Sequence, residues 1–406
     1  MALARQRALV IGGSVGGLFA AHVLRSAGWE VAVCERTSGD LGDRGTGIGT
    51  RPELFAAMRR AGIAADASLG IDVLGRTGLG PDGSVIHELA VPAVTSAWSR
   101  IWWPLRQALP DALYDGGKAL TGFEQHADGV TGIFADGGRL QADLLIGADG
   151  LHSTVRGQLC PGLVPRYAGY VAWRGVVEPH QLAPELHELM FKRMVFGFPD
   201  GELLLSIPMP VPHGEAGERC CHFVWFRPAN EPALRALCTD AGGRSHGLSI
   251  PPPLIRPELI EGIRHDAAAL LAPQLAALVT CTAQIILQPI FDLESPRVAE
   301  GRVALLGDAA FVARPHVASG VMKAALDAEA LVDALSAGAA DVGAALQRYN
   351  AGRQPYGAWL VQRGRHIGAT IAARNMQPNE RVETIMREYG AAGLVRDQPI
   401  AARAAG

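Results

Sequence analysis

The first stretch suited to ligand chemistry is a glycine turn in RALVIGGSVGGLFAAHVLRSAGWEVAVCER, residues 7–36. Gly12 and Gly17 occupy the first and third glycine positions of G-x-G-x-x-G, and Ser14 occupies the second. This pattern lets the backbone approach a pyrophosphate closely, which a small Ser also permits. Glu35 ends the second strand of the unit, where a carboxylate can accept hydrogen bonds from a ribose. The stretch predicts a dinucleotide site, with an ordinary tight turn as the alternative.

A second candidate is Asp308, in VALLGDAAFVARPHVASG, residues 303–320. The stretch begins as an apolar strand, turns at Asp308, and then passes through mostly small residues with Pro315 and His316 before a helix resumes. A short acceptor at the end of a strand suits contact with a ligand hydroxyl. An Asx turn or a helix cap would use the same residue type. The sequence leaves both interpretations open.

The elements that must position these residues alternate between strands and helices. The opening unit predicts a strand over 8–11, a helix over 15–27 and a second strand over 31–34, which together make one βαβ unit. Gly28 follows the helix in the position that favours a left-handed residue. We also expect a buried strand over 144–146 and a later helix over 319–335. Two hairpin turns are expected at 81–83 and 136–138.

A change of composition divides the chain into two predicted domains. From about 166 to 285, strand-like apolar runs are interrupted by Pro and Gly, which indicates a β-rich domain. After 301 the chain returns to the strand and helix pattern of its start. The fold class is therefore α/β, with a β-rich second domain interleaved. The predicted boundaries are 1–70, 100–165 and 286–395 for the dinucleotide domain, and 71–99 and 166–285 for the second.

Composition argues against several function classes. The 406 residues are 49% hydrophobic and carry a formal net charge of -3, so we expect no nucleic-acid partner. The most apolar stretch, over 267–279, contains Pro and Gln and is shorter than the roughly 20 residues of a membrane-spanning helix. We expect neither a membrane segment nor a signal peptide. The six cysteines show no C-x-x-C spacing, which favours reduced thiols, a cytoplasmic location and no metal site.

Three segments in order along the chain resemble the fingerprints of single-component FAD-dependent aromatic hydroxylases, which share the p-hydroxybenzoate hydroxylase fold. They are the glycine turn with Glu35-Arg36, the segment DLLIGADGLHSTVR, and the segment GRVALLGDAAFVARPHVASG. The resemblance implies a Rossmann-like FAD-binding domain with an interleaved substrate domain. Within the family, YAGYVAWRG and RPHVASGVMKAALDA are most similar to hydroxypyridine monooxygenases such as 2,6-dihydroxypyridine 3-hydroxylase.

The resemblance also implies which residues bind noncovalent FAD. Asp308 would accept a hydrogen bond from a ribityl or ribose hydroxyl. Asp149 would serve the pyrophosphate region and transient nicotinamide contact. Arg44 matches the family's loop arginine near the FAD phosphates, where a guanidinium suits an anion, with an exposed loop cation as the alternative. Arg36, which follows Glu35 in the first fingerprint, is also a cofactor candidate. Backbone N–H groups at the start of the last helix would reach the isoalloxazine ring, and the residues of that loop are Pro315, Ala318, Ser319 and Gly320.

Four positions depart from the family pattern. Phe311 stands where a His usually follows G-D-A-A, and Met322 replaces the customary Asn. Ala318 replaces the first glycine before the last helix, and Trp102 falls where an arginine is often found. Details of the flavin contacts are therefore open.

The implied reaction is the hydroxylation of an electron-rich ring. FAD is reduced by NADH or NADPH, O2 adds at flavin C4a to form a hydroperoxide, and one oxygen atom is transferred to a hydroxypyridine or phenol. As catalytic residues we favour Arg174, for an anionic substrate or reduced flavin, and His316, which titrates in a useful range. Further substrate candidates lie beside segments expected to face the flavin, each with a packed core residue as the alternative: Tyr170, Trp173, His213 and His222.

Two other functions stay open at this point. A flavin-dependent halogenase shares the FAD fingerprints but needs an early catalytic lysine, and this chain has only Lys118, Lys192 and Lys323. A nonenzymatic FAD-binding or sensing protein would need no substrate. The sequence does not decide the substrate, the choice between NADH and NADPH, any substrate-deprotonating base, or the oligomeric state, for which we consider a homodimer.

Overall fold

The glycine turn follows the central strand of a six-stranded sheet. The structure is a computed structural model that describes residues 6–42, 46–337, 341–373 and 376–390. The strand order is β18-β19-β12-β1-β2-β8, and only β18 runs antiparallel to its neighbour. The strands are β1 (Arg7–Ile11), β2 (Glu30–Glu35), β8 (Tyr114–Gly116), β12 (Leu144–Gly147), β18 (Ala299–Glu300) and β19 (Val303–Leu305). The apolar residues of β1 and β12 are buried, as parallel strands covered on both faces require.

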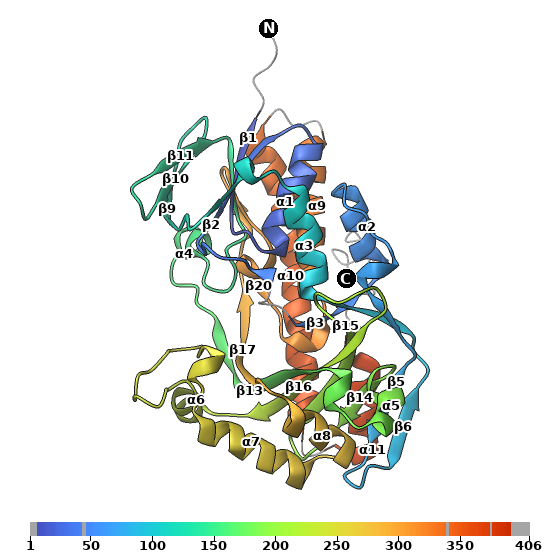
Figure 1. Ribbon diagram of the computed structural model, residues 1–406. Helices are drawn as coiled ribbons and strands as arrows, with labels where there is room; N and C mark the ends of the chain where they lie inside the picture. The colour runs from blue at the N-terminus through green and yellow to red at the C-terminus, as the bar shows by residue number, and fades with distance from the viewer. Residues whose placement is uncertain (1–5, 43–45, 338–340, 374–375, 391–406) are drawn as a thin grey trace, which may run out of the picture.

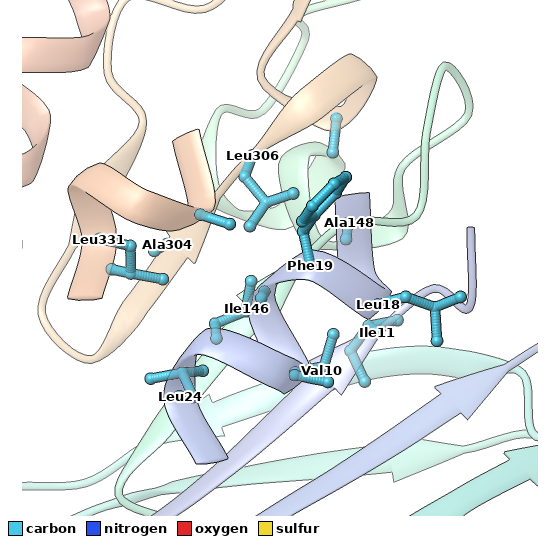
Figure 2. Packing of buried hydrophobic residues seen from close by; sticks show 14 of the residues in the cluster. Val10, Ile11, Leu18, Phe19, Leu24, Ile146, Ala148, Ala304, Leu306 and Leu331 are labelled. Atoms are coloured by element: carbon cyan, nitrogen blue, oxygen red, sulfur yellow. The ribbon is translucent and has the colours of Figure 1, made fainter. Parts of the chain in front are cut away.

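Helices from both ends of the chain pack against this sheet. They are α1 (Val15–Ser26), α3 (Trp98–Ala108), α9 (Gly320–Ser336) and α10 (Val342–Ala372). Figure 2 shows Leu18, Phe19 and Leu24 of α1 beside Ile146 and Leu306 in one apolar cluster. A three-stranded sheet of β9 (Leu120–Gln125), β10 (Val130–Phe134) and β11 (Arg139–Ala142) contacts β1 and β12. The first layer is therefore built from segments far apart in the sequence.

A second, eight-stranded sheet forms the lower layer in Figure 1. Its order is β20-β17-β13-β16-β15-β14-β5-β6. The strands are β5 (Arg76–Leu79), β6 (Val85–Leu89), β13 (Arg166–Val177), β14 (Met194–Gly197), β15 (Leu203–Pro210), β16 (Arg219–Pro228), β17 (Ile286–Glu294) and β20 (Phe311–Val312). The strand β17 leads directly to β18 and β19, so the two sheets are joined by a short stretch of chain.

The two faces of the eight-stranded sheet bury different apolar clusters. Because successive side chains of a strand point to opposite faces, Trp173 and Trp225 lie in one cluster while Ala172 and Val224 lie in another. The first face is covered by α5 (His187–Met190), α6 (Glu231–Leu237), α7 (Pro257–Leu270) and α8 (Pro273–Cys281). The second face packs against α10 and α11 (Pro378–Glu388), and α10 runs between the two layers (Figure 1).

The remaining elements fill the junction of the layers. A third small sheet has the order β3-β7-β4, with β3 (Gly47–Thr50), β4 (Ile71–Val73) and β7 (Ala93–Ala97). Two more helices are α2 (Pro52–Arg60) and α4 (Thr154–Leu159). Of the helices in the described ranges, none has the length and apolar character needed to cross a membrane. All six cysteines are free thiols.

The structure confirms the local elements predicted from the sequence. The first βαβ unit, the strand at 144–146 and the helix that begins near 319 are all present within one or two residues of the predicted ends. Gly83 and Gly137 have positive φ in the two predicted hairpin turns. The domain boundaries stay a prediction.

One departure from the family pattern has a packing consequence. Phe311 is fully buried, and a Cβ added to Gly357 of α10 would lie 2.1 Å from its ring. Gly352, on the same helix, has open space around the same position. The absence of a side chain at Gly357 therefore makes room for the Phe311 ring.

We predict that Gly357→Ala destabilises the protein although alanine favours a helix. Overpacking a core costs about 1–3 kcal/mol, whereas Gly352→Ala, as the control, should gain up to about 1 kcal/mol. Adding Phe311→Leu to Gly357→Ala should recover part of the loss. Urea unfolding of the three variants measures the differences, and equal midpoints for the two glycine variants would show that Phe311 does not constrain Gly357.

Candidate active site

A single cavity of about 830 Å³ runs from the glycine turn to the face of the eight-stranded sheet. This volume is within the usual range for ligand sites. The cavity is lined by the turns after β1, β12 and β19, the start of α9, β3, and residues of β13 and β17. Among the predicted site residues, those on its wall are Gly12, Ser14, Glu35, Arg36, Asp149, Arg174, Asp308, Pro315, Ala318, Ser319 and Gly320.

The glycines of the first turn are required by close backbone contacts. Gly12 has φ +113°, and a Cβ there would lie 2.3 Å from the Ala148 carbonyl oxygen. A Cβ at Gly17 would lie 1.9 Å from the Gly12 carbonyl oxygen. Trp102, which occupies the usual arginine position, donates from Nε1 to the Gly13 carbonyl oxygen at 2.9 Å. It therefore supports the turn from behind.

Glu35 holds the same turn while facing the cavity. Its Oε2 accepts the Gly13 N–H at 2.8 Å, and its Oε1 accepts the Thr37 N–H at 2.9 Å. Each carboxylate oxygen can accept a second hydrogen bond. Arg36 beside it is exposed at the cavity wall. Arg44 lies outside the described residues.

Asp149 caps the helix α4 rather than pointing freely into the cavity. Its carboxylate accepts the Ser153 hydroxyl at 2.5 Å and the Thr154 N–H at 2.7 Å. Burial raises the pKa of the carboxyl, and these hydrogen bonds act in the opposite direction. Arg156 of α4 donates to the Ala309 carbonyl oxygen at 3.1 Å. The Asp149 turn is thus tied to the turn that contains Asp308.

Asp308 presents an unused carboxylate to the cavity. It lies in the short 3-10 turn Gly307–Ala309, and within the described ranges no hydrogen bond to its side chain is found. The neighbouring Gly307 N–H is instead satisfied by Asp327, at 3.0 Å. Desolvation by the surrounding protein raises the pKa of the Asp308 carboxyl, and the nearby Lys323 cation opposes that shift. The helix-cap and Asx-turn interpretations are therefore wrong for this residue.

The loop before α9 brings backbone donors to the cavity. Ala318 has φ 47° and ψ 36°, and it is the only residue other than glycine with a positive φ in the described part of the chain. This costs conformational energy, which is typical of functional segments. The loop ends at Ser319, and within the described ranges no side chain caps the first N–H groups of α9. Such N–H groups and the helix dipole favour an anionic ligand.

Of the predicted substrate residues, only Arg174 reaches the cavity. Its Nε lies 3.2 Å from His222 Nε2, and its Nη1 donates to Gln288 Oε1 at 2.6 Å. His222 is fully buried behind it, and burial together with the Arg174 charge holds its pKa well below the usual value. Trp173 faces the other side of the sheet, because consecutive strand residues alternate. His213 is exposed against Trp103, away from the cavity wall.

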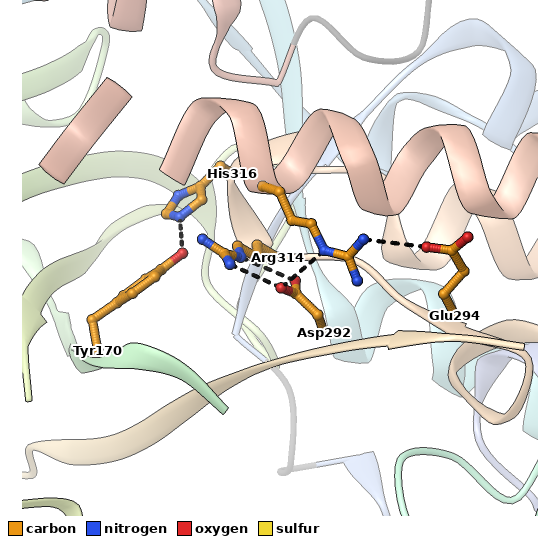
Figure 3. Close-up of polar contacts among 6 residues, drawn as sticks. Tyr170, Asp292, Glu294, Arg314 and His316 are labelled. Carbon is orange, nitrogen blue, oxygen red and sulfur yellow. Dashed lines mark hydrogen bonds and ion pairs between the residues drawn. The ribbon is translucent and has the colours of Figure 1, made fainter. Parts of the chain in front are cut away.

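The buried His316 pairs with the half-buried Tyr170 beneath the wall (Figure 3). The Tyr170 hydroxyl lies 2.6 Å from His316 Nε2, and both side chains pack against Phe226. Burial and the Arg314 cation lower the pKa of His316 to about 3. The prediction that His316 titrates in a useful range is therefore wrong, since the side chain stays neutral at neutral pH.

An ion-pair network holds Arg314 beside this pair. Arg314 donates through Nε and Nη2 to Asp292, at 3.0 and 2.8 Å, and its guanidinium lies 5.4 Å from the centroid of the Tyr170 ring. Arg365 of α10 bridges Asp292 and Glu294 (Figure 3). Because Arg314 precedes Pro315, this network fixes the start of the cavity loop.

Gln288 and Tyr389 are among the cavity residues that were not found from the sequence. Gln288 lies on β17 opposite Ala172, so it faces the same side of the sheet as Arg174. This placement depends on the register between β17 and β13, which no local pattern indicates. Tyr389 follows α11 and reaches the cavity from the far end of the chain. No local pattern indicates that contact. Among the described residues, no cluster of three or more His, Cys, Asp or Glu is arranged to hold a metal.

Comparison with known proteins identifies the family. Residues 105–226 match a model described as FAD binding domain, and residues 167–292 match one described as FAD binding domain-like. The 2,6-dihydroxypyridine 3-monooxygenase of Paenarthrobacter nicotinovorans is 32% identical over 338 residues, covering 80% of this chain and 82% of that protein. The chain belongs to the FAD-dependent aromatic monooxygenases.

Solved structures support the same assignment for the monooxygenase fold. The structure of 2,6-dihydroxypyridine-3-hydroxylase from Arthrobacter nicotinovorans matches with a TM-score of 0.85 and 29% identity, covering 92% of this chain and 95% of that one. Klebsiella pneumoniae HpxO, complexed with FAD and uric acid, matches with a TM-score of 0.75 and 25% identity, covering 95% and 92%. The predicted resemblance, α/β fold and flavoprotein monooxygenase activity are confirmed.

The cavity of this monooxygenase fits FAD. Within the described ranges the Asp308 carboxylate accepts no hydrogen bond, the first N–H groups of α9 are uncapped, and Gly12 leaves its backbone open to close approach. Hydroxyls, a pyrophosphate and an electron-accepting ring are the groups that such acceptors and donors suit. NAD(P)H and O2 are the co-substrates typical of the family.

We predict that Asp308→Ala weakens FAD binding without destabilising the apoprotein. Loss of a hydrogen bond to a charged acceptor costs about 1.5–3 kcal/mol, so FAD affinity should fall roughly 10- to 150-fold. Asp308→Asn keeps one acceptor and should lose less. Fluorescence titration with FAD and thermal unfolding of the apoproteins give the two quantities. Unchanged affinity, or a lowered apoprotein midpoint alone, would remove Asp308 from the cofactor site.

We predict that His316 makes the protein sensitive to acid. Because its folded pKa of about 3 is below the unfolded value of about 6.5, the unfolded state binds an extra proton between these values, and stability falls as pH falls. Between pH 6.5 and pH 4.5 this group should cost about 2 kcal/mol. His316→Gln should lose less stability than the wild type over that range in urea unfolding. If the free energy of unfolding falls with pH equally in both proteins, protonation of His316 is not the cause of the acid sensitivity.

Proposed function

We propose that this monooxygenase hydroxylates a small, electron-rich hydroxylated ring of the hydroxypyridine or phenol class. The observation that carries the proposal is the continuous cavity, which joins the Asp308 turn to the Arg174 face of the sheet. Apolar side chains of Met194, Ile207 and Val224 line that face and suit a flat ring. Relatives named for dihydroxypyridine and a relative bound to uric acid support a nitrogen-containing ring.

The proposed FAD contacts follow the residues that line the cofactor end of the cavity. Asp308 and Glu35 would accept hydrogen bonds from sugar hydroxyls, and Arg36 would lie near the phosphates, with Arg44 from outside the described residues. Asp149 would act by holding the α4 turn. The other proposed contacts are Gly12, Ser14, Pro315, Ala318, Ser319 and Gly320. Gly17 does not line the cavity and would act by allowing the close approach to the Gly12 carbonyl oxygen. We keep the two-domain division predicted from the sequence as part of this proposal.

Bound FAD supplies the reduction by NAD(P)H and the activation of O2. The chain would supply charge stabilisation, position and exclusion of water. The uncapped start of α9 would stabilise negative charge at the ring end of the cofactor. Arg174 would stabilise an anionic oxygen of the substrate. Apolar side chains around the ring would limit the entry of water.

His316 has no direct catalytic role in this proposal. It lies behind the cavity wall, where it holds the Tyr170 hydroxyl and accepts the Gly390 N–H through its carbonyl oxygen at 2.8 Å. Tyr170, Trp173, His213 and His222 likewise stay outside the proposed substrate contacts. His222 would act only by positioning Arg174.

The alternatives raised by the sequence lose support. The relatives described above are named as a monooxygenase and a hydroxylase. Lys118, the early lysine that a halogenase could use, lies at the cofactor end of the cavity and is paired with Asp136. A halogenase and a nonenzymatic FAD sensor are therefore not proposed. A cytoplasmic location remains a proposal, based on six free thiols. The homodimer also remains a proposal.

We predict substrate-stimulated turnover by the FAD-loaded protein. NADH and NADPH should each be tested with hydroxypyridines and phenols, with nicotinamide oxidation followed by absorbance and products followed by mass. A true substrate should speed nicotinamide oxidation and gain one oxygen atom, and ¹⁸O2 should label that atom. Label from water, or oxidation that yields hydrogen peroxide with no oxygenated product from any ring, would contradict the proposal.

A further inference from the structure

Arg174 is a cation at the cavity whose partners are both neutral. Two other partly buried arginines, Arg314 before the cavity loop and Arg353 of α10, are each paired with an aspartate. Arg174 bonds instead to an imidazole and an amide, those of His222 and Gln288. These partners fix the guanidinium in place without cancelling its charge.

The protonation states support an uncompensated positive charge. Arg174 Nε–H donates to His222 Nε2, so the neutral ring of His222 carries its proton on Nδ1, which has no partner in the described part of the chain. Burial lowers the pKa of Arg174 to about 10, which still leaves it charged at neutral pH. A buried charge without a counter-ion is costly. A ligand that carries a negative charge would offset the cost of burying the Arg174 guanidinium.

Further donors face the same end of the cavity. Gln288 uses Oε1 for Arg174, which leaves its Nε2 as a donor, and Tyr389 contributes a hydroxyl. No hydrogen bond to Gln288 Nε2, Arg174 Nη2 or the Tyr389 hydroxyl is found within the described ranges. All three residues line the cavity. Together they offer donors to the edge of a bound ring.

The described residues supply no carboxylate at this end of the cavity. Among the described residues that line the cavity, the acidic ones are Glu35, Asp149 and Asp308, and all three belong to the turns of the six-stranded sheet. Arg314 also lines the cavity near the sheet, but it is neutralised by Asp292. Within the described ranges, no acidic side chain complements Arg174, so we expect a ligand to bring the negative charge.

We propose that Arg174, Gln288 and Tyr389 bind an anionic, acceptor-rich edge of the substrate ring, namely an ionised hydroxyl beside a second acceptor. The proposal rests on the proposed function and narrows its substrate class. The cavity selects rings that enter as the anion and discriminates against the same rings when their hydroxyls are alkylated. Gln288 and Tyr389 are specificity-determining residues, and His222 is a positioning residue for Arg174.

The test is a binding measurement on the FAD-loaded protein without NAD(P)H. Dissociation constants are measured by flavin absorbance for 2,6-dihydroxypyridine against 2,6-dimethoxypyridine, and for 4-nitrophenol against 4-nitroanisole. In the wild type the ionisable ring of at least one pair binds more tightly. Arg174→Met should reduce that preference by about tenfold or more, because a charged hydrogen bond is lost. Arg174→Lys should keep part of it, and Tyr389→Phe and Gln288→Leu should each lower it.

The matched control is Arg227→Met. Arg227 lies on β16 of the same sheet but is paired with Glu202 and Asp266, so its loss should leave the preference unchanged. The proposal is overturned if neither ionisable ring is preferred by the wild type, or if Arg174→Met keeps the full preference. It is also overturned if Arg174→Met lowers the flavin midpoint potential while the preference stays, because Arg174 would then serve the reduced flavin. Failure of the proposed function would instead appear as the absence of oxygenated product, whatever the binding preference.

Discussion

The turn that presents Asp308 is held by charged side chains from two other elements, and the cofactor end of the cavity depends on it. Asp327 of α9 accepts the Gly307 N–H and is paired with Arg353 of α10, at 2.6 Å. Arg156 of α4 donates to the Ala309 carbonyl oxygen from the other side. Burying such charges is costly, so their value lies in the geometry that they impose. Because other residues satisfy the turn, the Asp308 carboxylate is left for a ligand.

The two ends of the cavity have opposite chemistry. The cofactor end offers carboxylate oxygens from Glu35 and Asp308, which suit ligand hydroxyls, while the sheet end offers the donors around Arg174. Because consecutive strand residues point to opposite faces, Arg174 faces the cavity while Trp173 packs beneath α7 and α8. One fold would therefore bring the cofactor and the proposed anionic ring into the same cavity.

The parts predicted correctly from the sequence are those set by local patterns. The glycine turn, the first βαβ unit and the hairpin turns follow from the spacing of apolar residues and from glycines that need positive φ. His316 could not be placed in this way, because its burial depends on Tyr170, Phe226 and Tyr389 from distant segments. Strand alternation alone shows that Trp173 and Arg174 face opposite sides of the sheet, so the two could not both contact the substrate.

The most direct measurement is a crystal structure of the FAD-loaded protein with 2,6-dihydroxypyridine bound. Our account predicts a cofactor sugar or ribityl hydroxyl within hydrogen-bond distance of the Asp308 carboxylate. It also predicts the pyridine ring between the flavin and the sheet, with its ionised oxygen on Arg174. A cofactor that makes no contact with Asp308, or a ring bound away from the sheet face of β13 and β17, would contradict it.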